Sequence, residues 1–183
     1  MRDPLVNKMF TVTAISGALS GITFPTVPGA LWVGPGLLFA VTTSWLFVRL
    51  KWLDNVQSLL WIFASTGAWY LAVRRYAMHA GDIGPHPSSD LIYMIESGLV
   101  GSLVLATVFS LLRRKINISN IAATTGAGIA AAAVMNGILT FGTDNGSSSL
   151  HGYVKFILAF VVWQVAVGLT LLRYKPATQT KKK

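Results

Sequence analysis

Long apolar stretches that are almost free of charged side chains make up most of this chain, and they constrain its fold more than any other feature. They run over about Val6–Phe24, Ala30–Leu50, Val56–Val73, Leu91–Leu112, Ile118–Phe141 and Val154–Leu172. The apolar core of a bilayer is about 30 Å thick, so a helix needs about 20 apolar residues to cross it and must satisfy its own backbone hydrogen bonds. The sequence therefore predicts an all-α, polytopic membrane protein with a bundle of six transmembrane helices.

The composition leaves little room for any other kind of domain. Of the 183 residues, 53% are hydrophobic and 11% are charged, whereas soluble domains contain about 25% charged residues. We expect a single transmembrane domain over residues 1–175, built from hairpins at 6–51, 53–115 and 117–175, and a polar, basic cytoplasmic tail at 176–183. The first apolar stretch lacks a small-residue cleavage site and leads directly into the second, so we interpret it as a retained span and not as a secretory signal.

The basic residues lie at the ends of the apolar stretches, mostly on one side. With an internal N-terminus, the inner side holds Arg2, Lys8, Arg49, Lys51, Arg113, Arg114, Lys115, Arg173, Lys175 and Lys181–Lys183, and the outer side holds Arg74, Arg75 and Lys155. Because basic residues are enriched in cytoplasmic loops, both termini are expected to be cytoplasmic. The formal charge of +9 is spread over helix ends, which argues against a nucleic-acid partner and favours contact with anionic lipid.

The second apolar stretch is interrupted near its start by Gly34, Pro35 and Gly36. Proline lacks the backbone N–H of a helical residue and clashes with the preceding turn. The helix is therefore expected either to kink at Pro35 or to begin after it.

Two short patterns recur along the chain and favour three two-helix repeats. The even-numbered stretches end in Arg-x-Lys (Arg49–Lys51, Arg113–Lys115 and Arg173–Lys175), and the odd-numbered ones contain a small triplet (Ser16–Ala18, Thr66–Ala68 and Thr125–Ala127). Internal repeats of this kind are common in membrane transporters. The alternative is chance, because basic stops and small triplets also occur in unrelated spans.

Glu96 is the one acidic residue inside an apolar stretch, about two turns from its outer end. A carboxylate at this depth is costly unless it is paired or faces the bundle interior, which makes it the first candidate for function. We expect Glu96 to face the interior within reach of Arg74 or Arg75, which end the preceding stretch. The pair is interpreted either as a structural link between two helices or as a substrate-binding or coupling carboxylate with its partner.

Asn136 and Gln164 lie within the fifth and sixth stretches. Amide side chains in spans usually hydrogen-bond to a neighbouring helix, and this is the favoured interpretation. The alternative is a polar path formed with Glu96 and Gln57.

Small residues four positions apart predict close helix contacts in the first and fifth stretches. The pairs are Ala14 with Ala18, Gly17 with Gly21, and Gly128 with Ala132. Each pair lies on one helix face and allows another backbone to approach. Packing inside this chain is favoured, and a partner subunit is the alternative.

Catalytic and metal sites have little support in the sequence. Cysteine is absent, and no nucleophile with its base, zinc-protease motif or phosphate-binding loop is present, so no enzymatic activity or cofactor is indicated. His79, His86 and His151 are weak metal-ligand candidates, because they fall in loop-like segments without a recognised ligand spacing.

The length, the six spans, the cytoplasmic termini and the Ala14-x-x-x-Ala18 motif together resemble the substrate-binding component of energy-coupling-factor vitamin transporters. The resemblance implies that the small-residue face of the first helix docks on a coupling subunit. It carries no ligand-binding residues over to this chain.

Two functions follow from these observations. The interrupted second stretch and the polar groups within spans favour a small transporter or a membrane substrate-binding subunit. The small-residue faces and the missing catalytic set favour, as an alternative, a non-catalytic structural subunit or assembly factor of a larger membrane complex. Expected partners are the lipid bilayer, other membrane subunits or further copies of this chain.

Overall fold

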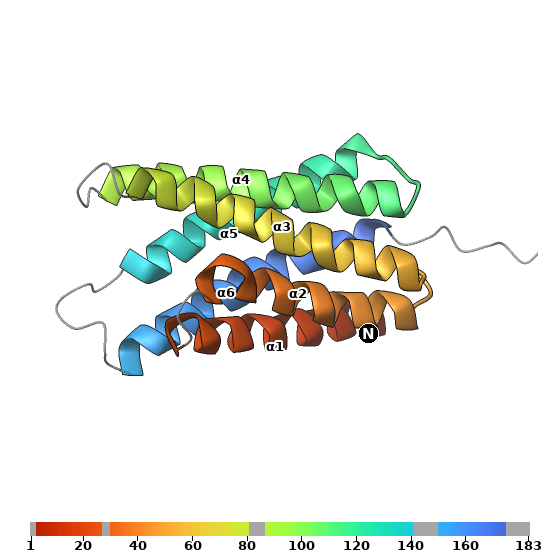
Figure 1. The fold of residues 1–183 in the computed structure, drawn as a ribbon, viewed down its shortest axis with the longest axis horizontal. Helices are drawn as coiled ribbons and strands as arrows, with labels where there is room; N and C mark the ends of the chain where they lie inside the picture. The colour runs from red at the N-terminus through yellow and green to blue at the C-terminus, as the bar shows by residue number, and fades with distance from the viewer. Residues whose placement is uncertain (1–2, 27–29, 81–86, 141–149, 175–183) are drawn as a thin grey trace, which may run out of the picture.

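A computed structural model describes residues 3–26, 30–80, 87–140 and 150–174, and over these ranges the chain is helical with short connections and no strand (Figure 1). The elements are α1 (Pro4–Thr26), α2 (Ala30–Arg49), α3 (Asn55–Ala80), α4 (Pro87–Leu112), α5 (Ile118–Thr140), α6 (Leu150–Leu171) and a short 3₁₀ helix, η1 (Leu172–Tyr174). The predicted all-α membrane bundle is confirmed.

Five helices are long and apolar enough to cross a membrane, over Pro4–Thr23, Asn55–Ala77, Leu91–Leu112, Ile118–Thr140 and Tyr153–Tyr174. In α2 (20 residues) the described side chains begin at Val33, and the apolar segment from there runs to Arg49. Over the described residues, the structure thus supports an integral membrane protein with five apolar helices long enough to cross a membrane.

Helix α2 continues through Pro35. The alternative in which this helix begins after Pro35 is therefore wrong. Because Pro35 has no N–H, the carbonyl four residues earlier loses its usual helical donor. The carbonyl of Pro35 itself accepts a hydrogen bond from Nε2 of Gln164 in α6 (3.4 Å), so a distant helix contacts α2 at the proline.

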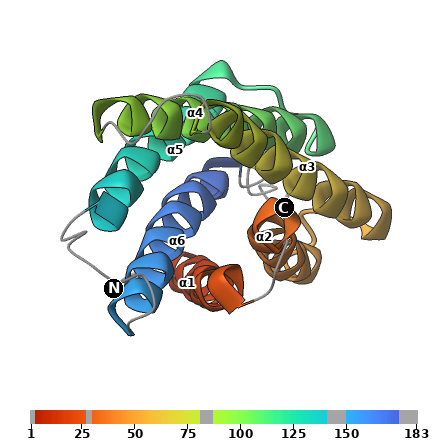
Figure 2. The same ribbon diagram turned by 60° about the vertical axis from the view of Figure 1, so that its left-hand side comes forward.

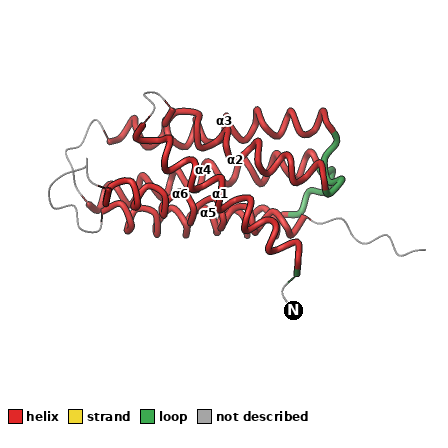
Figure 3. Tube along the Cα trace, turned by 90° about the horizontal axis from the view of Figure 1, so that it is seen from below, coloured by secondary structure: helices red, strands yellow, loops and turns green. Residues whose placement is uncertain are grey.

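The six helices form a closed ring. Each helix packs against the next one along the chain, and α1 also packs against α6 (Figure 2). Figure 3 shows the helices running along a common direction. One end, which we call the basic end, carries Lys8, Arg49, Lys51, Arg113, Arg114, Lys115 and Arg173 (at the right of Figure 1).

Glycines bring α1 and α6 into backbone contact. A Cβ atom built on Gly17 would lie 2.6 Å from Cα of Val161, and one built on Gly21 would lie 2.4 Å from Cα of Ile157. Real Cβ atoms do not approach a backbone this closely, so the contact requires glycine at both positions. Small residues stabilise membrane helix pairs through this close approach.

Aromatic side chains fill the ring toward the basic end. The ring centroids of Phe47 and Phe109 are 4.7 Å apart, those of Trp61 and Phe109 are 5.1 Å apart, and Tyr174 packs edge-on against Phe109 at 5.3 Å. The indole N–H of Trp61 donates to Oγ1 of Thr43 (2.9 Å), so its polar atom is satisfied although the side chain is fully buried. Tilted and edge-on aromatic pairs of this kind contribute stability beyond their buried area.

The α2–α3 and α4–α5 connections share one local structure. The backbone N–H groups of Lys51 and Trp52, and those of Arg114 and Lys115, donate back into the last turn of α2 and α4 in the Schellman pattern. Lys51 (φ 56°) and Arg114 (φ 49°) occupy the left-handed position of each turn. Asp54 then caps α3, with Oδ1 accepting from the N–H of Gln57 (2.8 Å), and Asn117 caps α5, with Oδ1 accepting from the N–H of Asn120 (3.2 Å).

Amide side chains one turn after these caps connect the two helices of a hairpin. Nε2 of Gln57 donates to the carbonyl of Leu112 (2.9 Å), and Nδ2 of Asn120 donates to the carbonyl of Arg173 (3.2 Å). In both cases the start of an odd-numbered helix binds the end of the helix that follows it.

The shared connections follow a different register from the recurring sequence patterns. The two left-handed residues are 63 positions apart in the chain, and so are the two capping residues. In contrast, Arg49 and Arg113 of the Arg-x-Lys pattern are 64 apart, and the triplet glycines Gly67 and Gly126 are 59 apart. The triplets therefore lie at different distances from their helix caps.

Replacing Gly17 with Val should destabilise the protein, whereas replacing Gly126 with Val should not. A side chain on Gly17 collides with the α6 backbone, while a Cβ on Gly126 meets no atom within 4 Å. Overpacking of this kind costs about 1–3 kcal/mol. Thermal unfolding of both variants in the same detergent would measure the difference, and equal losses would contradict the close α1–α6 contact.

Candidate functional site

A cavity of about 530 Å³ lies between α3, α4, α5 and α6, in the half of the ring away from the basic end. It is lined by Trp69, Ala72, Val73, Tyr76, Ala77, Met94, Ser97, Gly98, Ala132, Met135, Leu139, Phe156, Phe160 and Trp163. Its volume falls within the range of small-molecule binding sites, which is about 300–1,000 Å³.

Aromatic rings form the part of the cavity nearest the middle of the bundle. Trp69 packs against Phe160 (centroids 5.5 Å apart) and against Trp163 (5.8 Å). Trp163 in turn contacts Phe39 (6.2 Å), which joins the aromatic cluster at the basic end through Trp61. The cavity is therefore separated from the basic end by packed side chains.

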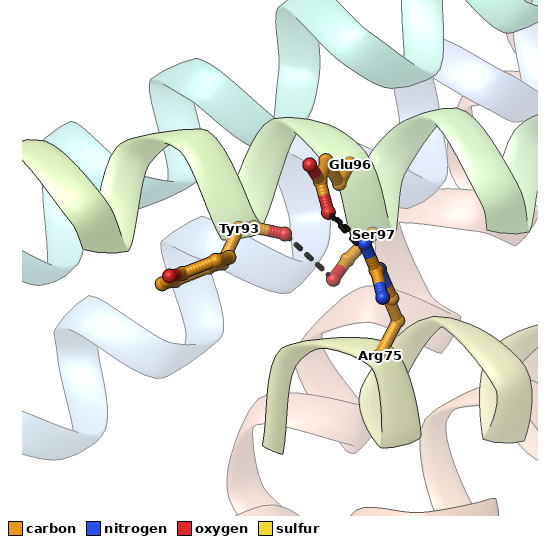
Figure 4. A network of polar contacts seen from close by, with 4 residues as sticks. All are labelled: Arg75, Tyr93, Glu96 and Ser97. Atoms are coloured by element: carbon orange, nitrogen blue, oxygen red, sulfur yellow. Dashed lines mark hydrogen bonds and ion pairs between the residues drawn. The ribbon is translucent and has the colours of Figure 1, made fainter. Parts of the chain in front are cut away.

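The cavity offers few polar groups to a ligand. The hydroxyl of Ser97 lines it, but this hydroxyl donates to the backbone carbonyl of Tyr93 (2.8 Å; Figure 4). Most of the other lining side chains are aliphatic, aromatic or thioether groups. The arrangement suits an apolar molecule or the apolar part of an amphiphile.

Arg75 and Glu96 form an ion pair beside the cavity (Figure 4). Nη2 of Arg75 lies 2.9 Å from Oε2 of Glu96, and Nε of Arg75 donates to the same oxygen (3.0 Å). The expected contact between Glu96 and one of the two arginines is thus present. The expectation that Glu96 faces the bundle interior is wrong, because the two side chains are 45% and 37% exposed. Arg74 is exposed and has no such contact among the described residues.

Asn136 and Gln164 are both buried, and neither is part of the Arg75–Glu96 ion pair. Asn136 follows the cavity-lining Met135 in α5 and is not itself in the lining. Gln164 follows the lining residue Trp163 in α6, and its Nε2 donates to Oγ of Ser20 (2.9 Å) and to the carbonyl of Pro35. Gln57 binds at the basic end. The structure does not bring these side chains together with Glu96.

The predicted small-residue faces contact other helices of this chain. Gly17 and Gly21 lie against α6, and Gly128 lies against Gly98 and Ser102 of α4, with Ala132 also next to Gly98. Ala14 and Ala18, which the transporter resemblance would place at a coupling subunit, are half-buried on α1.

The histidines fall outside the part of the structure in which side chains are described. His79, His86 and His151 therefore have no assigned surroundings here. Among the described residues, no group of three His, Asp or Glu side chains is placed to hold a metal ion.

Sequence reasoning missed the cavity. Trp69, Phe160 and Trp163 are aromatic residues deep in their spans, away from the interfaces where tryptophan usually concentrates, and this was the available signal. Which helices these aromatic side chains contact depends on how the six helices close into a ring. Sequence periodicity does not show that closure.

Comparison with known proteins found no matching family model, no matching curated protein and no matching solved structure.

Replacing Glu96 with Gln should change stability by less than about 1 kcal/mol, because exposed ion pairs seldom contribute more. A double-mutant cycle with Arg75→Gln, followed by thermal unfolding, would measure the coupling between the two side chains. A coupling of several kcal/mol would show instead that lipid removes water from the pair.

Proposed function

We propose that this protein is a small transporter or a membrane substrate-binding subunit that holds an apolar or amphiphilic small molecule. The observation that carries the proposal is the apolar cavity between α3 and α6, at membrane depth and separated from the basic end by packed aromatic rings. A ligand would reach the cavity from the end opposite the basic end or through the bilayer. Binding near the middle of the membrane, with access from one side at a time, is typical of secondary transporters.

Glu96 is a candidate for a role at this site. Its neighbour Ser97 lines the cavity, while the carboxylate is held outside by Arg75. A polar group of a ligand at the cavity mouth would compete with Glu96 for Arg75, so the ion pair is proposed as a partner for the ligand's polar end.

The alternative function, a non-catalytic subunit or assembly factor, is supported by one exposed face of α5. Ala122, Gly126, Ala130 and Gly137 are exposed, and a Cβ built on either glycine meets no atom within 4 Å. A face of small residues is suited to close approach by a partner helix or by a second copy of the chain.

The three-hairpin repeat also belongs to the proposal. The shared local structure of the α2–α3 and α4–α5 connections supports the repeat. The small triplets lie at different distances from their helix caps, so the support comes from the basic end alone. Repeats arranged around a central site are common in transporters.

Both termini are proposed to be cytoplasmic, with the basic end inside. Reporters fused after Lys115 and after Lys183 should then read as cytoplasmic, and one inserted near Ser88 as external, because basic residues are retained on the cytoplasmic side. Paired activity reporters in the host membrane would measure this. A cytoplasmic signal at Ser88 would overturn the orientation.

Filling the cavity should prevent ligand retention. Ala77 lines the cavity and is half-buried, so Ala77→Phe would occupy part of the space. The matched control is Val41→Phe, which places the same side chain at an exposed position of α2 outside the cavity lining. Mass analysis after purification in mild detergent should find a small molecule bound to the wild-type chain and to the control, and absent from the Ala77 variant.

The same measurement separates the two functions. A lone chain that carries a small molecule supports the binding function, and stoichiometric partner chains without a small molecule support the structural alternative. Equal retention in all three proteins would contradict the assignment of the cavity as the site.

A further inference from the structure

The cavity is closed toward the middle of the bundle by two tryptophans that neighbouring helices hold in place. A Cβ atom built on Gly36 of α2 would lie 2.4 Å from Cβ of Trp69, so Trp69 rests against the α2 backbone. A Cβ built on Gly101 of α4 would lie 3.8 Å from Cζ2 of Trp163. The two indole rings pack edge-on, with their centroids 5.8 Å apart. This floor is therefore backed by α2 and α4, which limits how far a ligand can extend toward the basic end.

The positions of the lining residues give the length of the cavity. On α3 the lining runs from Trp69 to Ala77, and on α6 it runs from Phe156 to Trp163. A helix rises about 1.5 Å per residue, so these two segments are about 12 and 11 Å long. The cavity therefore covers less than half of the apolar thickness of a bilayer, which is about 30 Å.

The cavity is wide for this length. Its volume of about 530 Å³, spread over about 12 Å, corresponds to a mean cross-section of about 45 Å². Non-bonded carbon atoms lie about 4 Å apart, so one extended alkyl chain needs about 20 Å², and a flat ring system about 10 Å wide needs about 40 Å². An alkyl chain that filled the cavity would have to fold back on itself, and fixing a flexible chain in one conformation reduces its affinity.

The side chains on the two sides of the cavity also suit a flat ring. Among the described lining residues, five of the eight on α3 and α6 are aromatic, whereas none of the six on α4 and α5 is. The α4 and α5 side includes Gly98 and Ala132, which contact each other, and the methionines Met94 and Met135. Aromatic rings make favourable edge-on and offset contacts with another ring, and thioether sulfurs pack well against ring edges. A ring between the two sides would make both kinds of contact.

We propose that the ligand of this cavity is a compact, rigid ring compound and not a long-chain lipid. With about 30 Å³ for each water-sized group of atoms, a volume of about 530 Å³ holds up to about 18 non-hydrogen atoms. A molecule of several fused rings has this size and fits the short, wide shape. This inference rests on the proposed function, because it names the class of molecule that the cavity would hold.

Two carboxylates of almost equal size test the shape of the ligand. 1-Pyrenecarboxylate is flat and rigid, whereas palmitate is a flexible chain with the same charge and almost the same number of non-hydrogen atoms. Each is titrated into the full-length protein in the same detergent. The rise in unfolding temperature gives its apparent affinity, because a ligand that binds only the folded state stabilises it. At equal mole fraction in the micelles, 1-pyrenecarboxylate should bind the wild-type chain at least about tenfold more tightly than palmitate.

A cavity variant and its control show whether this binding takes place in the cavity. Ala77→Phe narrows the cavity and should remove the preference for 1-pyrenecarboxylate. Val41→Phe, at an exposed position of α2, should keep the wild-type ratio of affinities. The ratio itself is measured on the wild-type chain, so it does not depend on the folding of either variant.

Three results would overturn the inference. Equal or tighter binding of palmitate that is lost in Ala77→Phe would show that the ligand is a chain, and the cavity would remain the binding site. Binding of neither carboxylate would exclude this class of ring compound, and a small molecule retained by the purified chain would still support the proposed function. A preference for 1-pyrenecarboxylate that survives in Ala77→Phe would place the ring compound elsewhere and would also contradict the cavity as the site.

Discussion

The contact between α1 and α6 is the interaction on which the rest of the structure depends. It joins the two helices that are furthest apart along the chain, and it closes the ring. Lipid is as apolar as the helix surfaces, so this closure depends on shape and close approach more than on hydrophobic burial. Gly17 and Gly21 provide the approach on one side, and Gly168 provides it where Thr13 packs against α6.

Closure of the ring divides its interior into two unlike halves. Large aromatic side chains fill the basic half, and the opposite half keeps an apolar cavity bounded by four helices. Gln164, whose Nε2 binds the carbonyl of Pro35, lies on the closing helix next to the cavity-lining Trp163. Movement of α6 would therefore affect both this hydrogen bond and the cavity.

The sequence was sufficient for the parts of the fold that depend on one helix at a time. Span length, the basic residues at helix ends and the small-residue faces are local properties, and the membrane bundle follows from them. The pairing of Arg75 with Glu96 was also predictable, because a hairpin brings those two positions to one level. Their exposure was not, since it depends on how α3 and α4 rotate against the ring.

The candidate sites were less accessible to sequence reasoning for the same reason. The cavity uses residues from four helices and the hydrogen bonds of Gln164 join three, and the α1–α6 contact brings together residues about 140 positions apart in the chain. The interruption at Pro35 was visible, but neither the continuation of the helix through it nor the hydrogen bond from Nε2 of Gln164 to the proline carbonyl was.

The amide links at the basic end have a mechanical consequence. Gln57 binds the end of α4 and Asn120 binds the end of α6, while Arg113 donates from the end of α4 to the carbonyl of Trp52. The two amide bonds hold the helices of one hairpin together at the basic end, so any opening of α3 from α4, or of α5 from α6, has its pivot there. The displacement of a helix grows with distance from the pivot. The walls of the cavity lie far from the basic end, so they would be displaced more than the residues near it.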